Sequence, residues 1–515
     1  MRRLAVLAAL LVLGAAPAHA APGQVLVELN GESGAFALQA SGGTLVSPAL
    51  RIWKVPGTAA TRLVPRLRAA GAARAVEPDR LLLCPYARRA FTDPLVPEEW
   101  WIPTVGADSV VAPGPGVPVT VIDAGLDMTH PEFANRPTTT VLNQQTLVGQ
   151  EEAHATAVAS VAGAPANGLG LVGVYPQAAL KVYDASPSDA IDEGSLIAGI
   201  DLASRAGRGV INLSLGSADD SEFIARAIVL AFGRGSIVVV AAGNQFEDGN
   251  PLSYPANDPH VLTVGATMEG DQPAPFSSTS AAMDLAAPGV DIPAAVPLAD
   301  DPSGYTTVDG TSFSSPLVAG AAAWVWTERP ALEKTQVFDL MRLSAKDVWS
   351  PGWDRNTGYG LLDIPNALSM APPPIDPLEP NDDIDQVKAR GIFAVAKPLV
   401  KGTLRARAAA VDDPHDVYRV NVPAQQTLTT SIKPDANLNL RLWGPLTRSV
   451  TETESAGVHD LLASSSRAGT QADVLRWTNR GKKTVVVYAD VFFPPGGTAP
   501  EVGYSLTVKT ARARR

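Results

Sequence analysis

Residues 209–244 read GVINLSLGSADDSEFIARAIVLAFGRGSIVVVAAGN and combine two strand patterns with one helix pattern. The beginning, GVINLSLG, and the end, SIVVVAAGN, are runs rich in apolar and β-branched residues. The segment between them has apolar residues at helical spacing, and these share one face: Ile224, Ala227, Ile228 and Ala231. Continuous apolar strands that alternate with helices are typical of a parallel sheet covered by helices on both faces.

The same alternation extends over residues 93–370. VPVTVID, which ends at Asp123, has the pattern of a buried strand, and SLIAGIDLASRAG has the pattern of a helix. Asp219 and Glu222 are placed as a capping box at the start of the helix in the opening stretch. We therefore expect an α/β domain over residues 93–370, with a mostly parallel sheet and helices on both faces.

Different patterns flank this domain on both sides. Residues 21–90 contain the strand-like GQVLVEL, the helix-like AATRLVPRLRAAGA and the strand-like ARAVEPDRLLL, which predict a small α+β unit. Residues 371–385 include the proline-rich APPPIDPLEPNDD, which breaks both periodicities and predicts a linker. Residues 386–515 hold short strands separated by turn residues and predict an antiparallel β-sandwich; the strands are DVYRVNV, TLTTSI, NLNLRLW, KTVVVYAD and YSLTV.

The N-terminus and the composition limit where the protein acts and what it binds. Residues 1–20 contain two arginines, an apolar run and a final AHA, as a secretory signal peptide does, so we expect a secreted or periplasmic protein. The net charge of -11 argues against a nucleic-acid or anionic-membrane partner. No later segment has the length and apolarity of a membrane span. Cys84 is the only cysteine, which excludes an internal disulfide, and we expect a monomer.

Three polar residues stand where a parallel α/β sheet gathers its chemistry, just beyond the carboxyl ends of strands. Asp123 ends a buried strand, where a carboxylate needs a hydrogen-bond partner. His154 lies in EEAHATAVASVAGA, whose small residues let an imidazole approach a strand. Ser312 begins the helix of DGTSFSSPLVAGAAAWVW, where free backbone N–H groups favour developing negative charge. Each alone is more often a cap, turn or packing residue, but the order Asp, His, Ser is one in which the hydrolytic triad recurs.

Several motifs extend this order into a family resemblance. VTVIDAGLDMTHPEF, HATAVASVAG, NLSLG, VVVAAGN, YPA and DGTSFSSPLVAG follow one another within about residues 93–370 and resemble the motifs of the subtilisin-like serine proteases. The resemblance implies that Asp123 orients the histidine, that His154 is the general base and that Ser312 is the nucleophile. The remaining hydroxyls of the Ser312 segment and its proline are then expected to start the helix.

The resemblance also implies residues that bind the oxyanion and the substrate. The side-chain amide of Asn244 and the backbone N–H of Ser312 would donate to the oxyanion. The substrate backbone would pair with the chain as an added strand, and the side chain before the scissile bond would enter a primary specificity pocket with Ser253 at its base. The substrate-binding residues are Ser214, Leu215, Gly216, Gly243 and Ser253. Because that base is small, we expect apolar residues of medium to large size before the scissile bond.

The chain departs from the family pattern at three positions. Ala155 and Ala157 stand where the family usually has Gly and His, and Leu317 stands where it usually has His. None of these side chains transfers a proton, so activity is still expected. Ala155 makes the backbone beside His154 less permissive than Gly would.

The expected function is a secreted serine endopeptidase that cleaves protein or peptide substrates through a Ser312 acyl-enzyme. No cofactor or metal is expected in the chemistry, and a structural calcium ion remains an open alternative. Residues 21–90 resemble the propeptide of these proteases in pattern. Through the motifs LEPNDD, DPHDVYRVNVPA and NLNLRLWGP, residues 386–515 and the end of the linker resemble the bacterial pre-peptidase C-terminal domain. The alternative from another class is a catalytically silent binding protein whose sandwich engages a surface.

Three other conspicuous segments receive structural interpretations. GLGLVG, residues 168–173, matches a dinucleotide-binding fingerprint, but a helical segment precedes it and a loop follows, so no dinucleotide is expected. His130 and His260 lie beside or near prolines in loop-like stretches and are expected on the surface. PNDD, residues 380–383, could bind calcium, although an acidic solvated linker is the favoured interpretation.

Overall fold

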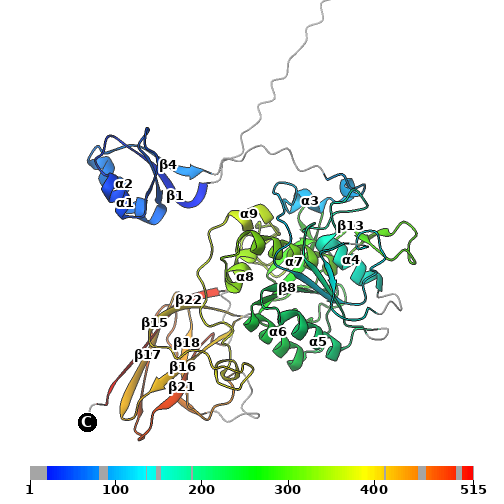
Figure 1. Cartoon of the computed structure of the whole chain (residues 1–515). Coiled ribbons are helices and arrows are strands. Elements are labelled where there is room, and N and C mark those ends of the chain that lie inside the picture. The colour runs from blue at the N-terminus through cyan, green and yellow to red at the C-terminus, as the bar shows by residue number, and fades with distance from the viewer. Residues whose placement is uncertain are drawn as a thin grey trace, which may run out of the picture. The chain divides into compact units, whose positions relative to one another are not determined.

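The computed structural model describes residues 20–80, 91–134, 136–145, 152–186, 190–410, 413–450, 460–494 and 501–513. The chain forms two compact units, residues 1–88 and 89–515, which are described separately (Figure 1). The predicted signal peptide lies outside the described residues except for its last position, and Cys84 lies outside them too.

The first unit is a four-stranded antiparallel sheet with two helices. The strand order is β2-β3-β1-β4, so the first and last strands of the unit are neighbours. Its core holds Val27, Leu29, Trp53 and Val55 from the sheet and Leu67 from the longer helix. This is the α+β arrangement that the sequence patterns predict. The elements are β1 (Ala20–Leu29), α1 (Ala35–Ala40), β2 (Thr44–Ser47), β3 (Ile52–Pro56), α2 (Gly57–Ala69) and β4 (Ala73–Arg80).

The second unit begins with an eight-stranded sheet of the order β11-β10-β9-β8-β5-β7-β6, in which β12 also pairs with β10. Within the described part of this sheet, β10–β11 is the only antiparallel pair, so the predicted, mostly parallel sheet is confirmed. The strands are β5 (Val119–Asp123), β6 (Thr139–Val141), β7 (Leu180–Asp184), β8 (Gly209–Leu213), β9 (Ser236–Ala241), β10 (Val261–Met268), β11 (Gln272–Pro273) and β12 (Leu285–Pro288).

Helices cover both faces of this sheet (Figure 1). On one face, α4 (Glu152–Gly163) and α7 (Thr311–Glu328) pack in a large core with alternate residues of the central strands. On the other face, α5 (Glu193–Ser204) and α6 (Glu222–Arg234) pack on the remaining strand residues. Alternate strand residues point to opposite faces, which is why β5 contributes Val121 to one core and Ile122 to the other.

The opening helix, α6, starts differently from the prediction. Its N-cap is Ser221, whose hydroxyl accepts a hydrogen bond from the N–H of Ile224, so the Asp219–Glu222 capping box is wrong by two positions. The predicted apolar face is confirmed. The remaining elements of this α/β part are η1 (Val96–Glu98), α3 (Trp101–Thr104), the β13–β14 hairpin (Ile292–Ala295 and Tyr305–Val308), α8 (Lys334–Leu343) and α9 (Ile364–Ser369).

The C-terminal part consists of two four-stranded antiparallel sheets, of the orders β15-β22-β17-β20 and β16-β21-β18-β19. Their inner faces form one core, which confirms the predicted sandwich. The prediction missed β15, β19 and β20, in which small, hydroxyl or charged residues alternate with few apolar ones. The strands are β15 (Gly402–Ala409), β16 (His415–Val422), β17 (Gln426–Pro434), β18 (Asn439–Trp443), β19 (Leu461–Ser465), β20 (Asp473–Asn479), β21 (Val485–Phe492) and β22 (Glu501–Arg512).

The segment between the α/β part and the sandwich is not a solvated linker. Glu379 and Asp382 are 8% and 6% exposed, and Asn381 between them is fully buried. The short helix α10 (Ile384–Val387) follows, and its Ile384 and Val387 pack against the sandwich. The interpretation of this acidic run as solvent-exposed is therefore wrong, because the tertiary contacts of the sandwich cover it.

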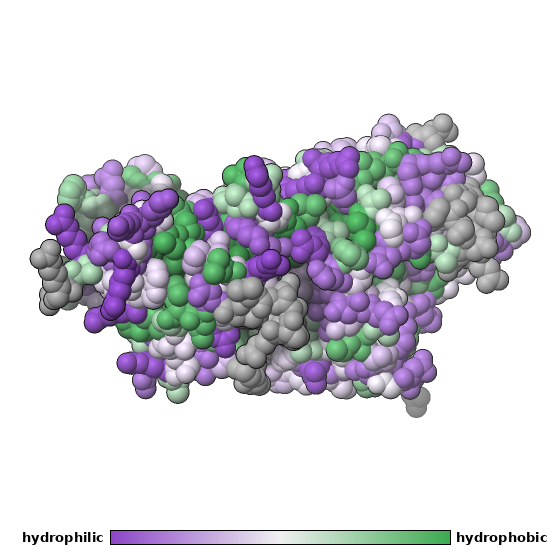
Figure 2. Space-filling model, turned by 90° about the horizontal axis from the view of Figure 1, so that it is seen from below, coloured by the Kyte–Doolittle hydropathy of each residue, from purple (hydrophilic) through white to green (hydrophobic). Residues whose placement is uncertain are grey.

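The surface of the described residues is mixed in polarity. Figure 2 shows hydrophilic and apolar residues interspersed over one face of the molecule. Within the described ranges, no helix combines the length and apolarity that crossing a bilayer requires.

Candidate active site

The central strands of the sheet bring three predicted residues to one edge. Strands β9, β8 and β5 are neighbours and run parallel, so their carboxyl ends meet at the same edge. Asp123 is the last residue of β5, Ser214 follows β8, and Asn244 follows β9. We call this the catalytic edge, and it is where the sheet geometry places chemistry.

Asp123 and His154 form a hydrogen-bonded pair at this edge. The Nδ1 atom of His154 lies 2.9 Å from Oδ1 and 3.1 Å from Oδ2 of Asp123. Asp123 is 1% exposed and also accepts a hydrogen bond from the N–H of Ala124. His154 is 34% exposed along its side chain, which leaves part of the ring accessible. A carboxylate at Nδ1 favours the tautomer with the proton on that nitrogen, so Nε2 is the nitrogen that could accept a proton in a reaction.

Small residues of α4 permit this approach. Ala155 and Ala157, two of the three departures from the family pattern, are buried at 0% and 2% exposure, and the helix continues through them without interruption. The backbone therefore accommodates Ala155 beside His154. The ring of His154 also lies 5.8 Å from that of Phe313, centroid to centroid, which places the imidazole beside the start of α7.

Ser312 is the second residue of α7 and is partly exposed. Its hydroxyl makes one long hydrogen bond, of 3.4 Å, to the backbone oxygen of Ser214. Gly310 caps the helix with a φ of +148°, in the region that favours glycine, and a β-carbon there would lie 3.3 Å from Nδ2 of Asn244. Glycine thus lets Asn244 come close to the helix start.

The other hydroxyls of this segment do not cap the helix, contrary to prediction. α7 has no side-chain cap hydrogen bond. Thr311 instead donates to Oδ1 of Asn244 at 2.8 Å, Ser314 donates to the backbone oxygen of Pro288 at 3.1 Å, and Ser315 donates to Oδ1 of Asn212 at 2.7 Å. The hydroxyls fasten the first turn of the helix to the ends of the neighbouring strands.

Pro316 explains one further contact. Proline has no N–H, so it cannot bond the carbonyl of the residue four positions before it, which is Ser312. The hydroxyl of Ser214 donates to that carbonyl at 2.7 Å, and Asn212 in turn donates to the hydroxyl of Ser214 at 3.0 Å. These two successive hydrogen bonds replace the missing helical bond and position the backbone of Ser312.

Asn244 is held with its amide in a defined orientation. Its Oδ1 accepts from the backbone N–H of Thr311 at 2.9 Å and from the hydroxyl of the same residue. The amide nitrogen is therefore the end of the side chain that remains available to donate. Sequence analysis did not identify Thr311 as the residue that orients Asn244, because the two are 67 positions apart.

The predicted substrate-binding residues converge on one another. A β-carbon on Gly216 would lie 2.5 Å from Oγ of Ser253, and one on Gly243 would lie 3.4 Å from Cβ of Ser253. Ser217 and Tyr254 form an isolated antiparallel bridge beside them. Ser214 and Leu215 continue from β8 toward this group. These residues therefore lie together, next to the Ser214 carbonyl that Ser312 contacts.

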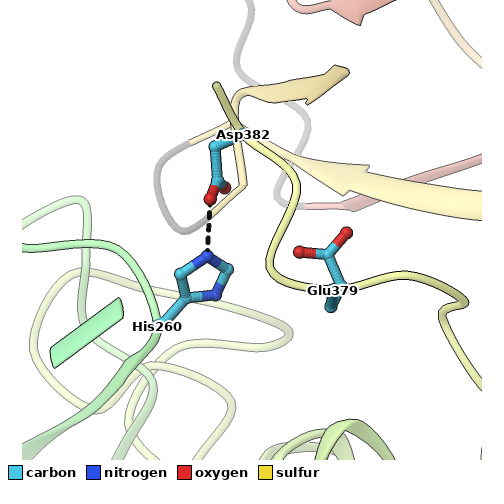
Figure 3. A group of neighbouring side chains, drawn as sticks. All are labelled: His260, Glu379 and Asp382. Carbon is cyan, nitrogen blue, oxygen red and sulfur yellow. Dashed lines mark hydrogen bonds and ion pairs between the residues drawn. The ribbon is translucent and has the colours of Figure 1, made fainter. Parts of the chain in front are cut away.

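The two histidines expected on the surface are buried. His130 is 0% exposed, and its Nε2 lies 2.8 Å from the carbonyl of Gly304. His260 is 4% exposed, and its Nε2 lies 2.8 Å from Oδ2 of Asp382 (Figure 3). The surface prediction is wrong because a neighbouring proline indicates a turn but does not indicate what packs over it.

The glycine-rich segment GLGLVG binds carboxylates of the chain itself. Burial raises the pKa of Glu99 to about 9 and that of Glu132 to about 7, which makes both acids prone to hold a proton. These buried acids were not identified from sequence. The segment's backbone N–H groups donate hydrogen bonds to three buried carboxylates, which include Asp93. We call this set the glycine-loop cradle: Gly168 N–H to Asp93 at 2.9 Å, Leu171 N–H to Glu132 at 3.2 Å and Val172 N–H to Glu99 at 3.2 Å.

Comparisons with known proteins bear on the α/β part. The model of the subtilase family matches residues 114–360. Subtilisin Savinase from Lederbergia lenta is 35% identical over 240 residues, which are 46% of this chain and 86% of that protein. Subtilisin DY from Bacillus licheniformis is 33% identical over 271 residues, which are 51% of this chain and 96% of that protein. Among solved structures, a lanthipeptide protease is similar over 53% of this chain and 94% of its own, with 24% identity and a TM-score of 0.45.

Proposed function

The chain belongs to the subtilase family and is a subtilisin-like serine endopeptidase, and we propose that Asp123, His154 and Ser312 are its catalytic triad and Asn244 its oxyanion donor. The observation that carries this proposal is the 2.9 Å pairing of His154 Nδ1 with the buried Asp123, beside the start of the helix that holds Ser312.

Acylation begins with the hydroxyl of Ser312. Its oxygen attacks the carbonyl carbon of the scissile peptide bond while Nε2 of His154 takes the hydroxyl proton. Asp123 keeps its hydrogen bond to Nδ1 and stabilises the imidazolium that forms. The same proton then passes from Nε2 to the leaving amine, the C–N bond breaks, and an acyl ester on Ser312 remains.

The tetrahedral intermediate carries its negative charge on the former carbonyl oxygen. The N–H of Ser312 lies in the first turn of α7, where the helix dipole is positive. Nδ2 of Asn244 is the second donor, held in place because Thr311 occupies its oxygen. Donors fixed before the reaction stabilise this charge without reorganising during it.

Deacylation repeats these steps with water. His154 Nε2 takes a proton from a water molecule, the hydroxide attacks the ester carbon, and the proton is returned to Oγ of Ser312 as the acid product leaves. The residues of this chain supply the base, the nucleophile and both oxyanion donors, so the chemistry needs no metal or cofactor.

The substrate is expected to bind beside the catalytic edge. The backbone of Ser214, Leu215 and Gly216 pairs with the peptide as an added strand. Gly216 and Gly243 leave room for the side chain before the scissile bond, and Ser253 forms the base of its pocket. We expect apolar side chains of medium to large size at that position, and a strict preference for Arg or Lys on a peptide library would contradict this.

The flanking segments complete the proposal. Residues 1–20 export the chain as a signal peptide, to the periplasm or outside the cell. The N-terminal unit is a propeptide that is removed by the enzyme itself, and the protein works as a monomer. The sandwich resembles a pre-peptidase C-terminal domain and lies outside the family match, which ends at residue 360.

A fluorophosphonate probe tests the proposal on the processed protein. We expect the probe to label wild type at Ser312 and not to label Ser312→Ala. The same variant should keep its pro-unit when expressed in a host without major extracellular proteases, because self-cleavage needs the nucleophile. An unlabelled, inactive wild type would favour a silent binding protein, and identical N-termini in the two forms would remove the self-maturation step.

A further inference from the structure

The two sheets of the sandwich differ in what covers their outer faces. On the sheet β16-β21-β18-β19, outward residues such as Val417 and Tyr488 pack with Ile384 and Val387 of α10. On the sheet β15-β22-β17-β20, the outward side chains are exposed or half-buried along all four strands. This second sheet therefore presents a broad surface to solvent.

The outer face of this sheet carries positive charge. The strand register and the alternation of side chains place four cations on it, one from each strand: Arg405 of β15, Lys433 of β17, Arg476 of β20 and Lys509 of β22. All four are exposed, and none pairs with an acid among the described residues. The acids Asp435 and Glu501 lie beyond them, at the end toward the α/β part, where Arg407 binds Glu501 at 2.8 Å.

Hydroxyl side chains fill the space between these cations. Ser505 lies between the cations of β15 and β17, and Thr429 lies between the cations of β22 and β20. The row between these two holds Thr403, Thr507 and Ser431 in register. The hydroxyl oxygens of Thr403 and Thr507 lie 2.8 Å apart, so one O–H of this pair remains free to donate outward. We call these five hydroxyl residues and the four cations the hydroxyl–cation face.

Sheet geometry sets the spacing of the charges. The two cations of each row are two strands apart, so their Cα atoms lie roughly 10 Å from each other. The two rows are separated by four residues of β22, which is roughly 13 Å along the strand. The face thus offers a regular array of positive charges with hydroxyl donors and acceptors between them.

The sandwich also differs in charge from the rest of the chain. Residues 401–515 hold 16 Lys and Arg and 10 Asp and Glu, a net charge of +6, whereas the whole chain carries -11, so residues 1–400 carry -17. A polyanion is therefore attracted to the sandwich and repelled by the remainder of the protein.

We propose that the hydroxyl–cation face binds an acidic polysaccharide. Such a polymer carries carboxylates and hydroxyls in alternation along an extended chain. Arg and Lys pair with carboxylates, and Ser and Thr hydroxyls both donate to and accept from sugar hydroxyls. An open face suits an extended chain, whereas small molecules are usually bound in concave pockets.

Three features favour a sugar polymer over other polyanions. Among its described residues, the face has no aromatic side chain on which nucleic-acid bases could stack. The apolar residue beside these rows, Val474, stands alone, so the face has no apolar surface to insert into a bilayer. The negative charge of residues 1–400 also opposes the approach of duplex DNA or an anionic membrane, both of which extend far beyond this face.

Binding at this face leaves the contacts between the sandwich and the α/β part in place. Those contacts include the 2.9 Å ion pair between Arg226 of α6 and Asp385 of α10, and α10 packs on the other sheet. The sandwich would therefore hold the enzyme on the polymer while the catalytic edge stays accessible to protein substrates. This attachment goes beyond the proposed function and does not depend on it.

Binding is measured on the full chain carrying Ser312→Ala, which prevents self-digestion. The probe is immobilised alginate, in which every sugar carries a carboxylate, and uncharged dextran is the control polymer. We expect binding to alginate and none to dextran. Because the contacts are made by exposed charges, binding should weaken by about 10-fold or more between about 50 and 200 mM salt.

A charge variant tests the face itself. Replacing its four cations together by Gln should weaken alginate binding by at least about 10-fold. The matched control removes the same charge from exposed loop positions of the sandwich, and it should weaken binding by less than about 3-fold. The control replaces by Gln the residues Arg448, Arg467, Lys482 and Lys483. Thermal unfolding shows whether each variant is folded.

A second variant tests the hydroxyls without changing charge. Thr429→Val combined with Thr507→Val keeps the shape of both side chains and suits a strand, so it should fold. It removes two hydroxyls from the middle of the face, and we expect alginate binding to weaken by about 3-fold or more.

Four results would overturn the proposal. Equal alginate binding by the parent and the four-cation variant would place the contact elsewhere. Equal losses in that variant and its loop control would show that net charge alone attracts the polymer. Unchanged binding in the hydroxyl variant would refute recognition of a sugar. Tighter binding to duplex DNA or to vesicles of anionic phospholipid than to alginate would assign the face to another class of partner. None of these readouts uses proteolysis, so a failure here is distinguishable from a failure of the proposed function.

Discussion

The catalytic edge and the segment that connects the α/β part to the sandwich both bury a carboxylate near a histidine, yet they differ in how the charge is balanced. Asp123 accepts from Nδ1 of His154 and from a backbone N–H, so the fold itself satisfies it. In the connecting segment, both oxygens of Glu379 lack a partner among the described residues, and burial raises the pKa of this acid well above the ordinary range. The first arrangement is complete for proton transfer, and the second favours an uncharged, protonated acid. Changes at the catalytic edge should therefore alter rate, and changes at buried acids elsewhere should alter stability.

The largest effect should follow from Asp123→Asn. The variant keeps the side-chain volume but presents an amide to His154, which favours the wrong tautomer of the imidazole. We expect kcat to fall by about 10⁴-fold. The free energy of unfolding should change by less than about 2 kcal/mol, because the amide oxygen can still accept from the backbone N–H of Ala124. Peptide hydrolysis and urea unfolding measure the two quantities.

This contrast between the catalytic edge and the other buried acids would be wrong if Asp123→Asn kept the wild-type kcat and lost stability. Such a result would assign Asp123 a structural role like that of the other buried acids. The base of the reaction would then have to be oriented by another group.

The next largest effect should come from the oxyanion donor. Asn244→Ala removes the amide nitrogen, and we expect kcat to fall by about 10²- to 10³-fold with little change in KM, as for the equivalent donor in a relative of this family. Thr311→Val should cost less, because the backbone N–H of Thr311 still holds Oδ1 of Asn244. Thr311→Ser restores the hydroxyl and should recover most of the rate. A Thr311→Ser variant as slow as Thr311→Val would show that the hydroxyl does not position Asn244.

The sequence predicted the catalytic edge more fully than the contacts that support it. Asp123, Ser214 and Asn244 each follow an apolar run, and parallel strands bring such positions together whatever the details of packing. The contacts from Ser315 to Asn212 and from Thr311 to Asn244 join residues 103 and 67 positions apart. Local patterns contain no information about such pairs, so the hydroxyls were interpreted as helix caps.

The burial of the connecting segment was missed for the same physical reason. PNDD resembles an exposed turn because its residues are polar and follow prolines, and His260 follows a proline as well. Their burial depends on a contact across 122 positions between the α/β part and the connecting segment. A run of acids indicates solvent exposure only when no other part of the chain packs over it.

A smaller effect should appear in the pH dependence of stability at the glycine-loop cradle. Burial raises the pKa of Glu99 from 4.5 to about 9, so between these values the folded state binds a proton that the unfolded state has lost. Stability from this group is therefore present at low pH and decreases as pH rises from about 4.5 to 9. We expect Glu99→Gln to remove at least about 2 kcal/mol of that decrease, since one pKa unit corresponds to about 1.4 kcal/mol.

Urea unfolding at pH 5 and at pH 9 measures this difference. Glu98→Gln is the matched control, because Glu98 is exposed and its neighbour Glu99 is buried. Equal decreases in wild type and Glu99→Gln would show that Glu99 is ionised in the folded protein. Neither variant should change kcat at a fixed pH, since Glu99 contacts Val172 and not the catalytic edge.

The smallest effect should be a change of substrate preference at Gly216. A β-carbon there would approach Oγ of Ser253 to 2.5 Å, and that hydroxyl can rotate away, so Gly216→Ala should fold. The added methyl group narrows the pocket before the scissile bond. A single methyl group in an apolar pocket changes discrimination by about 10-fold or somewhat more, so kcat/KM for phenylalanine should fall by about that factor relative to alanine. Combining Gly216→Ala with Ser253→Ala deletes the opposing hydroxyl and should recover part of the loss. If both variants kept the wild-type preference on a peptide library, Gly216 and Ser253 would not line the pocket, and the catalytic edge would bind its substrate elsewhere.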